Sequence, residues 1–169
     1  MGRMSENFRP ELEHELASTR KMLAVVPEGK WDWTPHAKSM SLGRLAGHVA
    51  TLPGWGSNTF KTERMDLSPE NMPKDARFAP KSREELLAKF DECAGELRTT
   101  LAATGDEEFG KTWTMTWMGK EAFSMPRVAV YRSTVGNHLG HHRGQLSLYL
   151  RMLDVPIPGM YGPSADEQF

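Results

Sequence analysis

Residues 128–153 read VAVYRSTVGNHLGHHRGQLSLYLRML, and their apolar side chains recur at intervals of three, four or seven residues. This spacing is typical of one face of an α-helix. The apolar positions are Val128, Tyr131, Val135, Leu139, Leu146, Tyr149 and Leu153. His138 and His142 fall on the same face, so we expect both imidazoles to point toward the interior of the protein.

Three earlier segments show the same helical periodicity. They cover residues 5–26, 41–61 and 82–103, and the fourth segment is expected to open at Ser124 and Pro126. Long connections rich in proline and polar residues separate the first three segments. The pattern predicts an all-α fold, a four-helix bundle with long crossover loops.

Local signals support these boundaries. Ser41 is suited to cap the second helix, within which Pro53 predicts a kink. Ser82 and Glu85 have the spacing of a capping box at the start of the third helix. Between the third and fourth helices, residues 110–123 alternate aromatic and polar side chains around a glycine, which predicts a short hairpin.

The overall composition indicates one domain, residues 1–169, with no affinity for nucleic acid. A chain of 169 residues is long enough to bury a sizeable core without dividing. Its 21 lysines and arginines are balanced by 22 acidic residues, which gives a net charge of −1. Such a balance supplies no basic field that would attract nucleic acid.

The single cysteine and the distribution of apolar residues predict a cytoplasmic protein. Cys93 has no partner for an internal disulfide, and it shares a helical stripe with Phe90 and Leu97, so we expect a buried thiol. No apolar run approaches the roughly 18 residues of a membrane span, and the N-terminal segment is too polar for a secretory signal. We therefore expect neither membrane association nor secretion.

Two histidines one helical turn apart indicate a metal site. Side chains at positions i and i+4 lie about 5 to 6 Å apart, so His138 and His142 could both bind one ion at about 2.0 to 2.1 Å. His48 lies beside Val49 in the apolar stripe of the second helix and supplies a third candidate. The alternative is that each is an ordinary core histidine with a hydrogen-bond partner.

Four stretches of the chain resemble one known family. They are Trp31–His36 (WDWTPH), Ser41–His48 (SLGRLAGH), His138–Gln145 (HLGHHRGQ) and Pro158–Glu167 (PGMYGPSADE). Together they are similar to the DinB-like superfamily of metal-binding helical bundles, which includes bacillithiol and mycothiol S-transferases. The resemblance extends over nearly the whole chain, and its most specific part is a histidine, a long gap and a His-x3-His pair.

This resemblance implies a four-helix bundle, commonly dimeric, in which three histidines hold a divalent metal ion. The implied ligands are His48, His138 and His142, and the ion is expected to be zinc or nickel. His141 lies about 100° around the helix from its neighbours and is expected to face solvent or a partner chain. Because members of the family are commonly dimeric, the resemblance also implies a homodimer.

The resemblance leaves the reaction open, because the family holds transferases, an isomerase and members without a known activity. The leading hypothesis is a metal-dependent thiol S-transferase, or a related enzyme whose metal activates a nucleophile. Its substrate would be a small molecule, with a low-molecular-weight thiol as the nucleophile. One alternative is a non-catalytic metal-binding, stress-associated protein, and another is a bundle without metal.

Other polar and aromatic side chains have weaker claims to a role. Trp55 lies two helical turns after His48 and could form the wall of a substrate pocket, although such a residue is more often in the core. Arg143 and Gln145 are expected to make hydrogen bonds that support the ligands or the helix packing. Asp166 and Glu167 are weak candidates for a general base.

The remaining histidines, His14 and His36, have no matching partner in the sequence. We expect them to lie on the surface or at a cap.

Overall fold

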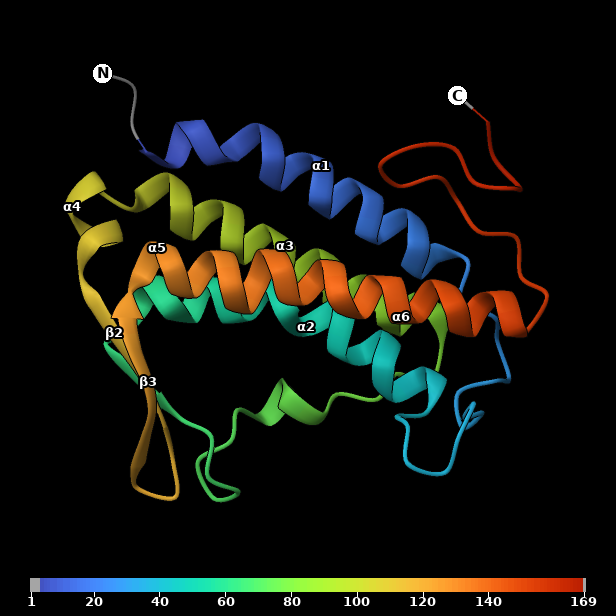
Figure 1. Cartoon of the computed structure of the whole chain (residues 1–169), viewed down its shortest axis with the longest axis horizontal. Helices are drawn as coiled ribbons and strands as arrows, with labels where there is room; N and C mark the ends of the chain where they lie inside the picture. Colours follow the sequence, from blue (N-terminus) through green and yellow to red (C-terminus); the bar gives the residue numbers. More distant parts are fainter. Residues whose placement is uncertain (1–3, 169) are drawn as a thin grey trace.

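A computed structural model describes residues 4–168, and its four long helical segments pack side by side as a bundle (Figure 1). They are α1 (Met4–Ala24), α2 (Leu42–Lys61), α3 (Arg83–Ala103) and a continuous segment made of α5 (Arg127–Val130), η2 (Tyr131–Asn137) and α6 (His138–Met152). The predicted four-helix bundle is therefore confirmed. Short helices occur in the connections, at η1 (Lys74–Arg77) and α4 (Asp106–Gly110).

The second helix begins where the sequence predicts. The hydroxyl of Ser41 accepts a hydrogen bond from the Arg44 N–H at 3.2 Å and caps α2. Pro53 lies inside the helix without ending it. Its ring nitrogen has no hydrogen to donate to the carbonyl one turn earlier, and the ribbon of α2 changes direction along its length (Figure 1).

The predicted capping box of α3 forms in part. The Ser82 hydroxyl accepts from the Glu85 N–H at 3.1 Å. The Glu85 carboxylate reaches back to the N–H of Lys81, at 2.8 Å, in place of the N–H of Ser82. Both bonds satisfy backbone donors near the start of the helix.

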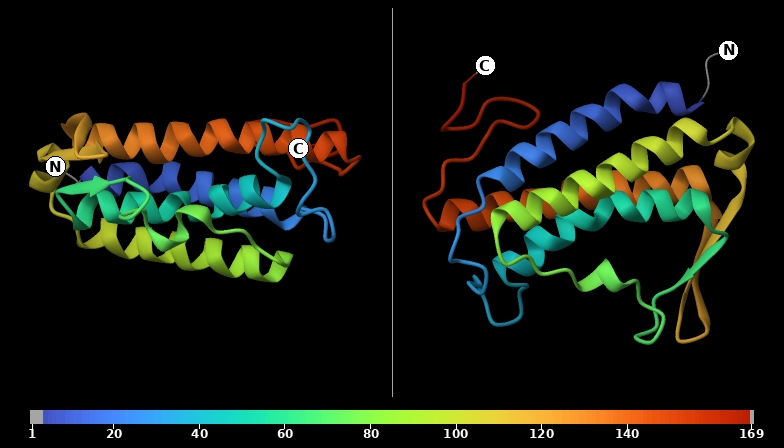
Figure 2. Two further views of the ribbon diagram at one scale, coloured as in Figure 1. Left: turned by 90° about the horizontal axis from the view of Figure 1, so that it is seen from below. Right: turned by 180° about the vertical axis from the view of Figure 1, so that it is seen from behind.

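The predicted hairpin is present at one end of the bundle (Figure 2). Its strands are β2 (Thr112–Trp117) and β3 (Lys120–Pro126), which pair antiparallel. Met118 and Gly119 form the turn with φ values of 51° and 73°. This left-handed pair matches the twist of a two-residue hairpin. A third strand that we did not predict, β1 (Arg64–Asp66), pairs parallel with β2.

The fourth helix begins later than predicted, at Arg127 instead of Pro126. Ser124 and Pro126 belong to β3, and the helix begins at Arg127. The hydroxyl of Ser124 pairs with that of Thr114 across the hairpin at 2.9 Å. Pairing with β2 therefore keeps residues 124–126 extended, and Pro126 acts as the N-cap instead of the first helical residue.

The core lies between the four long helices and consists mainly of leucine, valine and phenylalanine side chains. A smaller cluster of Met65, Trp113 and Val130 joins the sheet to the bundle. Within residues 4–168, each helix is too short or too polar to cross a membrane.

Candidate metal centre

Three histidines from two helices come together in the bundle. His48 comes from α2, and His138 and His142 are one turn apart on α6. The Nε2 atom of His138 lies 2.8 Å from Nε2 of His142 and 3.4 Å from Nε2 of His48. One ring nitrogen from each of the three lies within 4.8 Å of the others. The structure thus brings together the three side chains that the sequence singled out.

A hydrogen bond fixes the protonation of His142. Its Nδ1 lies 2.7 Å from Oε1 of Gln145. Because that oxygen can only accept, Nδ1 carries the hydrogen, and in the neutral imidazole Nε2 then carries a lone pair. Gln145 thus has the supporting role that the sequence indicated.

A backbone carbonyl fixes the protonation of His138 in a similar way. Its Nδ1 lies 3.3 Å from the carbonyl oxygen of Thr134. The preceding segment, η2, is a π-helix, in which the main-chain N–H of His138 bonds to the carbonyls of Ser133 and Val135. The Thr134 carbonyl is thereby spared the usual i→i−4 bond from His138 and accepts from its ring instead.

The resulting geometry suits a cation. Two neutral imidazoles direct their Nε2 lone pairs at one another across 2.8 Å, where neither can donate to the other. A proton on Nε2 of His48 would satisfy only one of them. A metal ion in contact with all three nitrogens would convert the repulsion into coordination, so the residues fit a divalent metal.

The electrostatic environment keeps the three rings neutral, which is the form that binds metal. Burial, together with the nearby rings of His142 and His138, lowers the pKa of His48 to about 4. Burial also lowers the pKa values of His138 and His142. Among residues 4–168, these side chains form the one group of three or more His, Cys, Asp or Glu residues able to hold an ion. A tetrahedral ion bound there would keep its fourth position open.

A pocket of about 280 Å³ opens beside the cluster, and His48 forms part of its wall. Trp55 contributes another part and packs edge-on against His48, with ring centroids 6.5 Å apart. Trp55 therefore lines a pocket and also packs against the smaller core cluster, so both positions considered for it are found in the structure. Arg44 and Arg77 also line this pocket, although neither was singled out from the sequence.

The other histidines lie outside the cluster. His141 is exposed on α6, as its helical position predicted, although its ring centroid is 4.8 Å from that of His142. His36 is exposed, as predicted, and its Nδ1 accepts the Lys38 N–H at 3.1 Å within a turn. His14 is exposed next to Tyr161.

Arg143 supports the packing of the helices. Its guanidinium is buried and lies 2.7 Å from the carboxylate of Glu15 on α1, while it also donates to the Thr19 hydroxyl at 3.0 Å. It therefore joins α6 to α1, one of the two roles expected for it. Cys93 is buried as predicted, and burial raises the pKa of its thiol to about 11.

The two acidic residues of the tail are engaged in ion pairs. Asp166 binds Arg151 at 2.5 Å and accepts the Ile157 N–H at 2.9 Å. Glu167 pairs with Lys21 and accepts a backbone N–H at 2.8 Å from Gly159. These contacts attach the tail to α1 and α6, so neither carboxylate has the place of a general base beside the histidines.

Comparisons with known proteins agree with this architecture. A family model described as the DinB superfamily matches residues 11–146. The protein YrdA of Bacillus subtilis (strain 168) is 25% identical over 163 residues, which cover 96% of this chain and 90% of YrdA.

Two solved structures have a similar fold. A DinB-like protein from Bacillus cereus ATCC 10987 has a TM-score of 0.69 at 22% identity, and the match covers 92% of this chain and 97% of that one. The DinB-like protein YjoA of Bacillus subtilis has a TM-score of 0.66 at 16% identity, over 94% and 98% of the two chains.

Proposed function

The chain belongs to the DinB superfamily, and we propose that it is a metal-dependent enzyme that activates a small nucleophile, in the first place a low-molecular-weight thiol, for transfer to an electrophile. The observation that carries this proposal is the position of His48. It belongs to the convergent histidine cluster and also forms the wall of an open pocket. A purely structural metal site would have no need of a pocket beside it.

The proposed metal is zinc or nickel. Imidazole ligands suit both, and three neutral ligands leave the ion its full positive charge. A divalent ion at this position would act as a Lewis acid and favour ionisation of a bound thiol or water near neutral pH.

The protein's own residues hold the three candidate metal ligands in place and orient their ring nitrogens. Gln145 and Thr134 direct the Nε2 atoms of His142 and His138 toward the common point. The buried Leu45 and Val49 on either side of His48 keep α2 packed in the core and so hold the third ring in place. Trp55 lines the pocket side, where its ring would limit the access of water to the ion.

A direct assay tests the proposal. The zinc- or nickel-loaded chain is mixed with monochlorobimane and with bacillithiol, mycothiol, glutathione or cysteine in turn. We expect one thiol to react well above the rate of the His142→Ala control. Cys93→Ala should keep the full rate, because its buried thiol is a poor nucleophile. Rates equal to the control with all four thiols would reject the enzymatic proposal.

The alternative is a non-catalytic, stress-associated protein in which the metal joins α2 to α6. Binding to the folded state alone adds about 2.7 kcal/mol to the stability at a hundredfold excess over Kd. Chelation should then lower the melting temperature and readdition of metal should restore it. This stabilisation, found together with an inactive bimane assay, would favour the alternative.

We also propose that the chain acts in the cytoplasm as a homodimer. The single unpaired cysteine suits a reducing compartment. Exposed apolar side chains at Leu148 and Met152, one turn apart on α6, would suit a contact between two copies. Light scattering at micromolar concentration should give twice the chain mass of 19.0 kDa. A mass near that of the single chain would reject the dimer.

A further inference from the structure

The pocket beside His48 has an uncompensated positive charge. Nine residues line it, among them Arg44, His48, Trp55, Arg77 and Trp117. Two of these are arginines, none is acidic, and most of the others are apolar. A concave site with apolar walls and a few polar groups at fixed positions is typical of small-molecule binding.

Arg44 is fixed in position next to the candidate metal centre. It lies one helical turn before His48 on α2, and its Nη1 donates to the carbonyl of Ala76 at 3.0 Å. This bond holds the guanidinium against η1 and leaves its other N–H groups available to a ligand. The bonded carbonyl belongs to the residue before Arg77, and both arginines line the same pocket, so the two cations lie on one wall of it. Burial lowers the pKa of Arg44, and the charge of Arg77 lowers it as well.

Arg77 has no carboxylate partner within residues 4–168. The acidic residue nearest to it in η1 is Asp75, which is bound to Lys89 of α3 at 2.6 Å. Two neighbouring cations without an acid repel each other, and an anion between them would relieve that repulsion.

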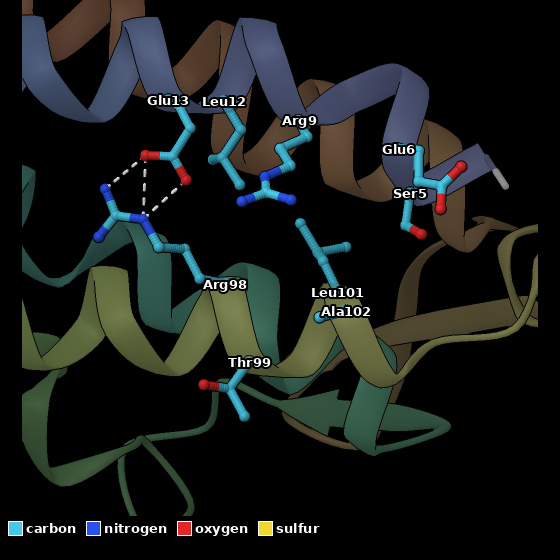
Figure 3. A pocket seen from close by; sticks show the side chains of 9 residues that line it. All are labelled: Ser5, Glu6, Arg9, Leu12, Glu13, Arg98, Thr99, Leu101 and Ala102. Atoms are coloured by element: carbon cyan, nitrogen blue, oxygen red, sulfur yellow. Dashed lines mark hydrogen bonds and ion pairs between the residues drawn. The ribbon is translucent and has the colours of Figure 1, made fainter. Parts of the chain in front are cut away.

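A second pocket, between α1 and α3, is also lined by two arginines and allows a comparison of their partners (Figure 3). There Arg98 faces Glu13 across the two helices, and the two side chains form an ion pair at 2.7 Å. Glu6 lines the same pocket, close to Arg9 in sequence. Arg98 of that pocket is thus paired with a carboxylate, whereas within residues 4–168 neither Arg44 nor Arg77 forms an ion pair.

We propose that Arg44 and Arg77 bind the acidic group, a carboxylate or a phosphate, of a small substrate whose apolar part lies against Trp55 and Trp117. This inference rests on the proposed function, because it describes the substrate of the same site. Guanidinium groups recognise such oxyanions through paired, charge-assisted hydrogen bonds. Since His48 lines the same pocket, an acid held there would place the rest of the molecule near the histidine cluster.

Matched acid and neutral probes test the inference without relying on thiol chemistry. Calorimetry compares 3-phenylpropionate with its amide, and phenyl phosphate with phenol, on the full chain with and without zinc. We expect one acid to bind roughly tenfold more tightly than its neutral partner in both forms, as a charge-assisted pair would provide. The pair that shows the preference identifies the acidic group as a carboxylate or a phosphate.

Substitutions locate the binding. Arg77 is exposed, so Arg77→Gln should fold normally and should reduce acid binding by roughly fivefold while amide or phenol binding is unchanged. The double substitution Arg44→Gln with Arg77→Gln should abolish the preference. Arg9→Gln, in the pocket between α1 and α3, should keep it. Circular dichroism checks folding, and Arg44→Lys, which retains the charge, should keep part of the preference.

Two results would overturn the inference. One is equal affinity for acid and neutral probes in both pairs. The other is a preference that survives the double substitution, which would mean that the anion binds elsewhere, for instance at the metal. The bimane assay tests the proposed reaction separately. If acid binding depends on the arginines but no thiol is transferred, the proposed reaction is rejected and the anion site stands.

Discussion

Nδ1 of His142 donates a hydrogen bond to Oε1 of Gln145 over 2.7 Å, and this contact decides which nitrogen faces the other two histidines. We predict that Gln145→Ala lowers zinc affinity by about 10- to 100-fold, the usual effect of removing a residue that orients a ligand. Competition with a chromophoric chelator measures the zinc affinity. Gln168→Ala, in the exposed tail, is the matched control, and equal affinities of the two variants would contradict the role of Gln145.

The histidines themselves should divide into two groups. His48→Ala, His138→Ala and His142→Ala should each reduce bound metal sharply in elemental analysis of protein without a histidine tag. His141→Ala should retain the metal, because that side chain is exposed and lies outside the group of three ring nitrogens, next to the ring of His142. If His141→Ala loses as much metal as His142→Ala, the assignment of the ligands is wrong.

The metal-free chain should lose stability as the pH falls. Unfolded His48 takes up a proton near pH 6.5, whereas burial in the folded protein lowers its pKa to about 4. Its contribution is complete above pH 6.5 and is lost between these values, by at most about 1.4 kcal/mol per pH unit for one proton. Urea unfolding at pH 7, 6 and 5 should show a shallower loss for His48→Gln, and parallel curves would exclude a contribution from His48.

Gly47 allows the crossover connection to pack directly on α2, one residue before His48. A Cβ atom at this position would lie 2.3 Å from the carbonyl oxygen of Phe78, where neither backbone can yield easily. We predict that Gly47→Ala destabilises the fold by about 1–3 kcal/mol despite the better helix propensity of alanine. The control is Gly95→Ala in α3, whose Cβ would meet nothing within 4 Å and which should be neutral or stabilising.

Local signals in the sequence were sufficient to predict the four long helices and the hairpin, except for the start of the fourth helix. Ser41 and Ser82 cap the helices that they were predicted to cap, because capping depends on residues within one turn. The parallel pairing of β1 with β2 was not predicted. It joins Arg64 to Thr114, and a strand of three residues carries no periodic signal of such a distant partner.

The helical spacing was enough to predict the three candidate metal ligands. His48, His138 and His142 were grouped because each lies on an apolar face, whereas the role of Thr134 depends on the π-helix before His138. The sequence carries no separate signal for that segment, because the steps of four between Tyr131, Val135 and Leu139 are also those of one face of an α-helix.

The π-helix also restricts how this gene can change. Deleting one residue from 131–137 would rotate the two ends of the helical segment relative to each other by about 100°. Arg127 ties one end to the carbonyl of Thr62 at 2.8 Å, and Arg143 ties the other to α1. A deletion would break one of these attachments or separate His138 from His48. Single-codon losses here should therefore be far less tolerated than substitutions.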